Sequence, residues 1–360
     1  MRVIVAGGGT AGHIEPALNT ADALLAMDPS TQVLALGTPK GLESELVPSR
    51  GYELALVPAV PFPRRPGRAL LSLPTRLRKA VHAARGIIDE FQADVVVGFG
   101  GYAALPAYLA ARGRVPIVVH EANAKAGLAN RVGARFTSFR AETHAGSLPA
   151  AVRIGLPLRR AIVDLDREPA RPGARAMFGL DPDRPVLLVF GGSQGARRIN
   201  DAIVGSASEI VASGASVLHA VGGKNADQRP PADLPQYVTV DYLDRMDLAY
   251  AAADLAVCRA GAMTVAELSA VGLPAVYVPP PIGNGEQRRN AAEVVAAGGG
   301  LLVADEDMTA ASAGQLLPDL LGDPVRLRTM GKCAASQGDP GAAGRLATMV
   351  TQAAATRGIR

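Results

Sequence analysis

The stretch VIVAGGGTAGHIEPAL, residues 3–18, joins a run of aliphatic residues to a glycine-rich turn and then to a helix-forming segment. A second stretch, VLLVFGGSQGARRIND at residues 186–201, repeats this order. A strand followed by a glycine turn and a helix is the opening of a βαβ unit, in which the strands run parallel. The chain therefore begins the same motif twice, once in each half.

Short apolar runs alternate with alanine-rich helical stretches through both halves. This alternation predicts an α/β fold with parallel sheets covered on both faces. The polar segment from Asp164 to Pro185, rich in proline and arginine, is typical of a linker. We therefore expect two doubly wound, Rossmann-like domains facing each other across a ligand crevice, with one large sheet and an insertion as the alternative. The expected strands are 2–6, 32–36, 52–57, 94–99, 116–119, 136–139, 152–154, 186–190, 216–221, 237–240, 254–258, 274–278 and 301–303.

Composition places the chain among globular proteins, because 48% of its 360 residues are hydrophobic and 19% are charged. Two cysteines, Cys258 and Cys333, are too few for a disulfide scaffold. Since the chain opens on a strand and not on a signal peptide, we expect free thiols in a reducing cytosol. The longest uncharged runs, 95–111 and 268–285, are broken by glycine and proline, so we expect no membrane-spanning helix.

Positive charge is concentrated in the first half of the chain. Residues 1–150 carry a net charge of +5 and the remainder −1, and the stretch 60–85 holds seven basic residues and no acidic one. Leucines recur there at helical spacing beside cations, which suits docking on an anionic membrane surface. An ordinary core-facing helix with a solvated basic side is the alternative. The residues expected to meet lipid are Leu70, Leu73, Arg76, Leu77 and Lys79.

The first glycine turn matches the dinucleotide pattern G-x-G-x-x-G at Gly7, Gly9 and Gly12. An NAD site also needs an acidic residue at the end of the second strand, and no acid occurs there before Glu43. Lys40 is a weak candidate for the basic partner that NADP requires. The missing acid therefore argues against a dinucleotide cofactor.

What the glycine turns offer instead is backbone N–H groups and helix starts that suit anions. Three such turns suit a donor diphosphate and an acceptor phosphate, and none has the Lys-Ser/Thr pair of a P-loop. No metal-ligand spacing occurs in the sequence. Tight βα turns without a ligand are the alternative. The residues expected to form the acceptor diphosphate loops are Gly8, Gly9, Gly100, Gly101 and Tyr102.

His13 follows the first turn at the start of the expected helix. There the helix dipole disfavours the imidazolium ion and keeps the ring neutral. A neutral histidine in a cleft can act as a general base. A purely local role, as a cap or hydrogen-bond partner, remains open from its position alone.

The stretch from Cys258 to Ala291 carries polar groups suited to a nucleotide sugar. Thr264 lies near the first turn of an expected helix, where its hydroxyl suits a phosphate, and Glu267 lies one turn further, where it suits ribose hydroxyls. A solvated carboxylate is the alternative for Glu267. Glu286 and Gln287 are expected in a loop, where their polar groups can bind sugar hydroxyls.

Five motifs together resemble the MurG family of N-acetylglucosamine transferases. They are GGGTAGH, GFGGYAALPA, HEANAKAGLANR, GGSQGARRIN and RAGAMTVAEL, the last followed by GLPAVYVP and NGEQRRNA, and they span nearly the whole chain in the family's order. The resemblance implies a GT-B fold, with residues 1–160 as an acceptor- and membrane-docking domain and 161–340 as a UDP-sugar domain. It implies that 341–360 form a helix returning to the first domain.

The resemblance also implies the reaction. UDP-N-acetylglucosamine would donate its sugar, with inversion, to the 4-hydroxyl of a lipid-linked muramyl-pentapeptide at the cytoplasmic face of the membrane. His13 would be the base, with Glu121 as the second candidate, and no metal or other cofactor would be essential. Other cell-wall or division proteins are expected partners, and nucleic acid is not. The donor would be bound by Thr10, Ala11, Gly12, Asn123, Arg159, Ser193, Leu243, Ala262, Met263, Thr264, Val265, Ala266, Glu267 and Gln287.

Two departures from the family pattern are small. The motif before Arg159 usually reads Gly-Asn-Pro but here has Leu156 as its middle residue, and Ala11 replaces a common glycine. The alternatives to this function are another GT-B enzyme, such as a UDP-N-acetylglucosamine epimerase or a transferase with another acceptor. An NADP-dependent oxidoreductase and a non-catalytic nucleotide-sugar-binding protein are alternatives from other classes.

Overall fold

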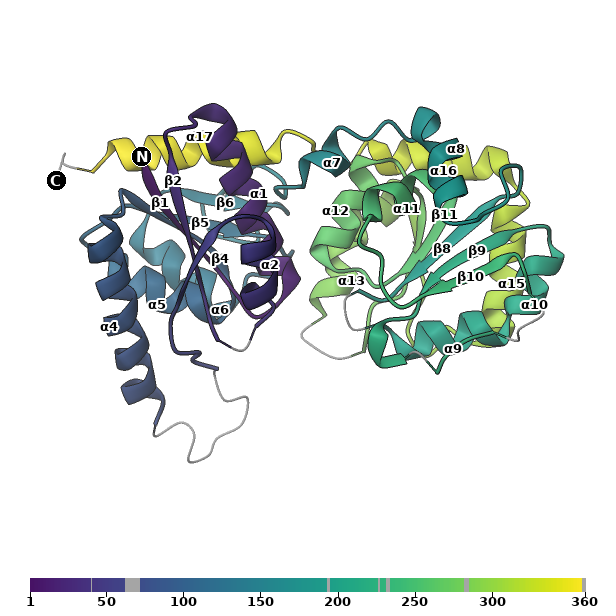
Figure 1. The fold of residues 1–360 in the computed structure, drawn as a ribbon, viewed down its shortest axis with the longest axis horizontal. Helices are drawn as coiled ribbons and strands as arrows, with labels where there is room; N and C mark the ends of the chain where they lie inside the picture. Colours follow the sequence, from purple (N-terminus) through teal and green to yellow (C-terminus); the bar gives the residue numbers. More distant parts are fainter. Residues whose placement is uncertain are drawn as a thin grey trace. The chain divides into compact units, whose positions relative to one another are not determined.

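The computed structural model describes residues 1–39, 41–61, 72–192, 195–225, 227–230, 234–281 and 285–357. They form two compact units (Figure 1). Unit 1 comprises residues 1–159 and 340–360, and unit 2 comprises residues 160–339. Unit 2 is thus one continuous stretch, whereas unit 1 is completed by a segment that follows unit 2 in the sequence.

The described part of unit 1 contains a parallel sheet with the strand order β3-β2-β1-β4-β5-β6-β7. The central strand β1 pairs Val3 with Val33 of β2 on one side and with Val95 of β4 on the other. The expected parallel sheet is therefore confirmed. The strands are β1 (Arg2–Gly7), β2 (Gln32–Gly37), β3 (Glu53–Leu56), β4 (Val95–Gly100), β5 (Ile117–Glu121), β6 (Arg140–Glu142) and β7 (Val152–Arg153).

The strand expected at 136–139 was wrong. Phe136 ends a 3₁₀ turn, η1 (Ala134–Phe136), and β6 begins only at Arg140. The hydroxyl of Thr137 donates to the carbonyl of Ile117 at 2.6 Å and accepts from the N–H of Phe139 at 3.0 Å. Side-chain hydrogen bonds of this kind compete with strand pairing. Residues 136–139 therefore form the connection that leads into β6 and are not part of a strand.

Helices cover both faces of this sheet. On one face, Val3 and Val5 pack with Ile14 of α1 and Leu346 of α17. On the other face, Ile4 packs with residues of α4 and α5. Successive residues of β1 therefore point to opposite faces, as expected for a strand buried on both sides. The helices are α1 (Ala11–Met27), α2 (Glu43–Ser49), α4 (Leu73–Phe91), α5 (Gly101–Ala111), α6 (Leu128–Gly133) and α17 (Ala342–Ala355).

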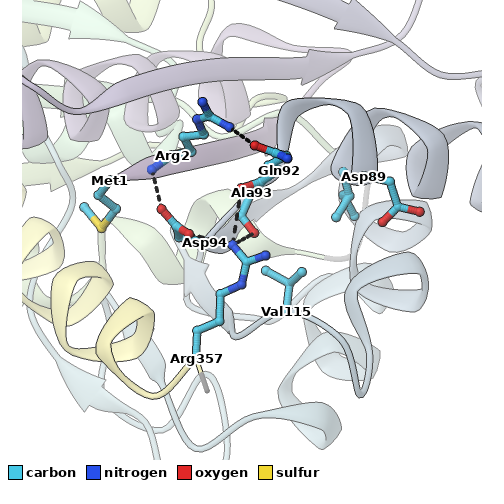
Figure 2. A pocket seen from close by; sticks show the side chains of 9 residues that line it. Met1, Arg2, Asp89, Gln92, Ala93, Asp94, Val115 and Arg357 are labelled. Atoms are coloured by element: carbon cyan, nitrogen blue, oxygen red, sulfur yellow. Dashed lines mark hydrogen bonds and ion pairs between the residues drawn. The ribbon is translucent and has the colours of Figure 1, made fainter. Parts of the chain in front are cut away.

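Helix α17 lies beside α1 (Figure 1, yellow and purple), and the residues that follow it are tied to the start of β4. The guanidinium of Arg357 donates to the carbonyl of Ala93 at 2.7 Å and pairs with Asp94. Asp94 also accepts from the backbone N–H of Arg2 at 2.7 Å. Figure 2 shows these groups pointing toward one another in a pocket that Val115 also lines. Asp94 thus connects β1 and β4 to the segment after α17.

The described part of unit 2 contains a second parallel sheet, with the order β10-β9-β8-β11-β12-β13. Its centre pairs Val189 of β8 with His219 of β9 and with Val257 of β11. This is the same doubly wound arrangement as in unit 1, as the repeated motif predicts. The strands are β8 (Val186–Phe190), β9 (Ser216–Ala220), β10 (Tyr237–Val240), β11 (Leu255–Cys258), β12 (Ala275–Tyr277) and β13 (Gly300–Leu302).

The helices of unit 2 bury one face of this sheet against Ile199 and Ile203 of α9 and Leu317 of α15. Gly223–Asn225 form a 3₁₀ turn, η2. The helices are α7 (Arg160–Val163), α8 (Arg167–Met177), α9 (Arg197–Gly205), α10 (Ala207–Ala212), α11 (Met246–Ala252), α12 (Ala262–Ala270), α13 (Glu286–Asn290), α14 (Ala292–Ala296), α15 (Ala310–Leu321) and α16 (Pro324–Ala335).

The prediction of a linker from Asp164 to Pro185 was wrong, because this segment contains α8. Helix α8 packs on α11. Arg175 is buried and pairs with Asp254 at 2.8 Å, and Arg167 donates to the carbonyls of Tyr250 and Gly272 at 3.0 and 3.1 Å. Arginines that look solvated in the sequence therefore hold the helix to the unit.

Two histidines are buried among the strands of the two sheets. In β5, His120 donates through Nε2 to the carbonyl of Gly155 at 2.9 Å. In β9, His219 lies 2.6 Å through Nδ1 from the Tyr237 hydroxyl and 3.1 Å through Nε2 from Oδ1 of Asn200. Burial lowers the pKa of each ring to about 4. Both rings are therefore neutral at physiological pH.

These histidines should make stability fall on mild acidification. Between pH 6.5 and about 4, the unfolded chain binds protons at these positions that the folded chain does not. The stabilising effect is complete above pH 6.5, and each histidine should remove about 1.4 kcal/mol of unfolding free energy per pH unit below it. Urea titrations from pH 7 to 5 check this. His120→Asn and His219→Asn should each make the pH dependence shallower, and unchanged slopes in both variants would contradict the assignment.

Candidate functional site

Each sheet has a switch point, where two neighbouring strands lead to helices on opposite faces. It lies between β1 and β4 in unit 1 and between β8 and β11 in unit 2. Ligands of open α/β sheets bind at the carboxyl ends of the strands at this point. The chain leaves these four strands at Gly7–Gly9, at Gly100 and Gly101, at Gly191 and Gly192, and at Arg259–Gly261. The glycine turns singled out in the sequence therefore occupy the two switch points.

In unit 1, the two glycine turns touch each other through their backbones. A Cβ atom on Gly101 would lie 2.1 Å from the carbonyl oxygen of Gly8. Gly9 and Gly100 have φ angles of 92° and 97°, which side chains rarely adopt. Tyr102 is 46% exposed, and its ring lies 3.4 Å from where a Cβ of Gly9 would be. The five residues expected to form the acceptor diphosphate loops are thus brought together.

His13 lies in the first turn of α1, against this pair of turns. The hydroxyl of Thr10 is 3.1 Å from its Nδ1 atom. A Cβ on Gly100 would lie 3.1 Å from its Nε2 atom, so the absence of that carbon gives the ring its space. Burial lowers the pKa of His13 below its ordinary 6.5, and the negative charge of Glu43 partly opposes this. The ring is neutral at pH 7 and makes a local hydrogen bond through one nitrogen.

Glu121 ends β5 and is only 2% exposed. Its carboxylate accepts from the backbone N–H of Asn123 at 2.9 Å, from that of Gly127 at 3.1 Å and from Nδ2 of Asn130 at 2.9 Å. Burial raises the pKa of Glu121, whereas these hydrogen bonds oppose the rise. Both carboxylate oxygens are thus engaged in holding the loop that carries Asn123. This arrangement suits a carboxylate that shapes the loop better than one that receives a proton.

Of the residues predicted to reach the donor sugar, Thr10 is exposed, whereas Ala11, Gly12 and Asn123 are half-buried. Thr10 contacts the His13 ring, and Asn123 belongs to the loop that Glu121 holds. Arg159 belongs to a separate cluster, in which its Nε atom lies 3.2 Å from Oε2 of Glu15. Glu15 is buried and also pairs with Arg50 at 3.1 Å. The sequence reasoning missed this acid, although it stands two residues after His13.

In unit 2, the turn after β8 is closely packed. A Cβ on Gly191 would lie 2.2 Å from the backbone nitrogen of Ala196, and one on Gly195 would lie 2.3 Å from the carbonyl oxygen of Val221. Gly195 also has a φ of 73°. Ser193, expected at the diphosphate, lies outside the described residues, as do Lys40 and Leu70.

The turn after β11 leads into the first turn of α12. The N–H of Val265 bonds the carbonyl of Gly261 at 3.0 Å, so the three preceding N–H groups are the ones that a helix start leaves for a ligand. Ala262, Met263, Thr264 and Ala266 are half-buried, whereas the Val265 side chain is buried in the core. Val265 can therefore face a ligand only through its backbone.

The predicted nucleoside and sugar contacts lie on or near the same helices. Glu267 is buried and accepts from the Tyr250 hydroxyl at 2.8 Å, so it is not a solvated carboxylate. Leu243 is buried at 6% exposure. The loop expected at Gln287 is instead the first turn of α13, which begins at Glu286 directly after Gly285 with its left-handed φ of 76°. Within the described residues, the buried Oε1 of Gln287 has no hydrogen-bond partner.

The described part of the basic stretch includes the first half of α4, whose basic side chains lie on its outer side. Ala80, Ala84 and Ile88 face the core, whereas Leu73 and Leu77 are partly exposed. Arg76 donates to the carbonyl of Ala59 at 3.4 Å. A groove of about 830 Å³ runs along this side, which we call the α4 groove. Its lining residues are Pro74, Thr75, Leu77, Arg78, Lys79, Val81, His82, Arg85 and Leu109.

The described residues contain neither a metal-binding cluster nor a helix suited to crossing a membrane. No group of three or more His, Cys, Asp or Glu side chains could hold a metal ion. In the same residues, no helix has both the length and the apolar character that crossing a membrane would require.

The chain matches two protein-family models. Residues 3–139 match the glycosyltransferase family 28 N-terminal domain, and residues 186–346 match the glycosyltransferase family 28 C-terminal domain. The boundary between the two matches falls in the stretch where unit 1 gives way to unit 2.

Similar proteins agree with this family. The UDP-N-acetylglucosamine–N-acetylmuramyl-(pentapeptide) pyrophosphoryl-undecaprenol N-acetylglucosamine transferase of Streptomyces coelicolor is 58% identical over the full length of both chains. That of Mycobacterium avium is 57% identical, over 96% of this chain and 87% of its own.

Solved structures are similar as well. The crystal structure of Acinetobacter baumannii MurG has a TM-score of 0.78 at 28% identity, covering 98% of this chain and 99% of its own. The calicheamicin glycosyltransferase CalG4 has a TM-score of 0.66 over the full length of both chains, and at 18% identity it supports the fold alone. The expected GT-B fold is thereby confirmed. The chain belongs to glycosyltransferase family 28, within the family of MurG N-acetylglucosamine transferases.

Proposed function

We propose that this chain transfers N-acetylglucosamine from UDP-N-acetylglucosamine to the 4-hydroxyl of undecaprenyl-diphosphate-linked N-acetylmuramyl-pentapeptide. The names of the 55–58% identical relatives support this substrate pair. The observation that carries the proposal is the neutral His13 ring set between two glycine turns at the unit 1 switch point. Such a site places a general base, His13, beside backbone turns that can bind phosphate.

In the proposed reaction, the muramyl 4-oxygen forms a bond to the anomeric carbon while the bond from that carbon to UDP breaks. A single displacement of this kind inverts the anomeric centre. Nε2 of His13 takes the proton of the attacking hydroxyl, with Nδ1–H donating to Thr10, 3.1 Å away. The proton then passes to solvent and the negative charge leaves with UDP.

We further propose that unit 2 holds the donor. The N–H groups of the first turn of α12 stabilise the charge of the leaving diphosphate, so no metal is essential. Glu267, fixed by Tyr250, accepts from the ribose hydroxyls. The Oε1 of Gln287, which has no partner among the residues that the structure describes, accepts from a sugar hydroxyl. The Leu243 backbone holds the uracil.

The acceptor is held in unit 1. Its diphosphate lies over the turns at Gly8–Gly9 and Gly100–Tyr102, where the starts of α1 and α5 offer backbone N–H groups. Its lipid stays in the membrane, with the α4 groove docked on anionic headgroups at the cytoplasmic face. Partly exposed Leu73 and Leu77 beside exposed Lys79 support this placement.

One assay tests the proposed reaction against its alternatives. UDP release from UDP-N-acetylglucosamine is measured with and without the lipid-linked muramyl-pentapeptide. Release that depends on this acceptor supports the transferase. Acceptor-independent conversion of the donor would indicate an epimerase, and binding without turnover would indicate a non-catalytic nucleotide-sugar-binding protein.

Membrane docking has its own expected result. Arg78 and Lys79 are exposed at the α4 groove, and a cation near an anionic surface is worth about 1 kcal/mol. The double variant R78E/K79E should therefore bind anionic vesicles at least about tenfold more weakly in sedimentation assays at low salt. The matched control is R328E/K332E on exposed positions of α16, which changes the net charge equally. Equal loss in both variants would show only a net-charge effect.

A further inference from the structure

Glu43 is a buried carboxylate that the proposed reaction does not use. It is the first residue of α2 and its exposed fraction is 0%. Its Oε2 atom accepts from the backbone N–H of Gly9 at 3.0 Å. Its Oε1 atom accepts from the N–H and from the hydroxyl of Thr38, at 2.7 and 2.8 Å. It thus connects the end of β2 to the glycine turn after β1.

The surroundings of Glu43 are shaped to this carboxylate. A Cβ atom on Gly8 would lie 2.7 Å from its Oε1, one on Gly37 would lie 2.6 Å from its Cγ, and one on Gly41 would lie 1.8 Å from its Oε2. Three glycines therefore form a slot that the side chain fills. Since the slot has no spare volume, the carboxylate has one position in it.

A short path leads from Glu43 to His13. Gly9, which Glu43 holds, directly precedes Thr10. The carbonyl of Thr10 accepts from the backbone N–H of His13 at 3.1 Å, and its hydroxyl lies 3.1 Å from the ring. We propose that Glu43 is a positioning residue, which fixes the glycine turn and through Thr10 the orientation of the His13 ring. This inference rests on the proposed function of His13.

Charge supports the same role. Burial by itself would raise the pKa of Glu43, but the hydrogen bonds from Gly9 and Thr38 hold it below its ordinary value. Glu43 is therefore ionised at pH 7. Its negative charge raises the pKa of His13 against the larger, opposite effect of burial. Removing that charge should lower the pKa of His13 further.

Two variants test the proposal in different ways. In Glu43→Gln the side chain keeps its shape, but its NH₂ group faces the N–H of either Gly9 or Thr38, which leaves that donor without an acceptor. In Gly41→Ala the new Cβ displaces the carboxylate while leaving the charge in place. The matched control is Glu142→Gln. Glu142 is also buried in unit 1 and accepts from the N–H groups of Gly146 and Leu148, at 2.8 and 2.9 Å.

Two readouts are measured on the full-length protein. In the transfer assay, kcat should fall at least about tenfold in Glu43→Gln and Gly41→Ala, because misplaced catalytic groups lose rate steeply. In histidine-labelled NMR titrations, the pKa of His13 should be lower in Glu43→Gln than in the wild type. Glu142→Gln should change neither quantity, even where its thermal stability falls.

The outcomes separate this inference from the proposed function. If the wild type shows no acceptor-dependent turnover, the proposed function fails, and the His13 titration still decides the role of Glu43. If the wild type turns over and Glu43→Gln keeps both its kcat and its His13 pKa, the inference is overturned. It is also overturned if Glu142→Gln reproduces both changes, since Glu43 would then be an ordinary structural carboxylate.

Discussion

Replacing His13 by alanine is expected to lower kcat for N-acetylglucosamine transfer by a factor of about 10² to 10⁴. The variant removes the proposed acceptor of the muramyl hydroxyl proton. The Thr10 hydroxyl, which lies 3.1 Å from Nδ1, then loses its partner. UDP binding should stay within about twofold of the wild type, because the proposed uridine contacts belong to unit 2. Steady-state kinetics and isothermal titration with UDP measure the two effects.

A second substitution separates the base from the local hydrogen-bond partner. His13→Asn can still bond the Thr10 hydroxyl, but its amide does not accept a proton at neutral pH. If His13 is the base, the asparagine variant should be about as inactive as the alanine variant. If His13 only supports the turn, the asparagine variant should keep most of its activity. That second result would remove His13 from the proposed mechanism.

The pH dependence of the transfer activity tests the role of His13 as the base independently. A general base must be neutral to work, so activity should fall at pH values below the pKa of His13. Because burial lowers that pKa, the midpoint of the acid limb should lie below 6.5. An acid limb centred above 6.5 would contradict a buried, neutral base. The profile must be recorded above the range in which unfolding begins, which urea titration at each pH defines.

Gly101→Ala is expected to cost about 4 kcal/mol of unfolding free energy and to abolish turnover. Gly101 has a φ of 75°, and a Cβ there would lie 2.1 Å from the backbone oxygen of Gly8. A backbone atom cannot rotate away as the end of a side chain can. The two turns must therefore separate, which moves the proposed diphosphate loops apart. Urea denaturation and the transfer assay measure both losses.

Gly51→Ala is the matched control. Gly51 has nearly the same φ, 77°, but nothing lies within 4 Å of where its Cβ would be. This variant carries only the left-handed backbone cost, about 1 kcal/mol, and should keep wild-type kcat. The difference between the two variants thus measures the contact between the turns. Similar losses of unfolding free energy in both variants would show that only the backbone φ matters and that the contact between the two turns adds nothing.

The fold was largely predictable because its strands are buried on both faces. Such strands are continuous aliphatic runs, and Val186–Phe190 was predicted with its bounds. The prediction at 136–139 failed for a different reason, because the strand there is the short, partly polar Arg140–Glu142, which the apolar pattern does not mark. Helix α8 was missed because its Arg and Pro content resembles a linker. The burial of Arg175 against Asp254 depends on tertiary packing, which cannot be predicted from composition.

The site was predictable in position and less so in chemistry. Residues that follow parallel strands gather at one edge of the sheet, which is why the turn before His13 and the turn at Gly100 could be placed together. Spacing does not reveal hydrogen-bond partners. It could not show that the oxygens of Glu121 are engaged by its own loop. In the sequence, Glu43 was considered only as a possible ribose ligand of a dinucleotide site. Spacing could not show that its carboxylate accepts a hydrogen bond from the N–H of Gly9.

The division of unit 1 into two segments sets an order of events during synthesis. The ribosome makes residues 1–159 first, yet the face of their sheet at Val3 and Val5 is covered in part by Leu346 and Val350 of α17. Residues 160–339 are made in between, which takes roughly 10 to 40 s at ordinary rates of elongation. The second unit can therefore finish folding while the first still lacks one of its helices. An apolar sheet face is the surface that nascent-chain chaperones would meet in that interval.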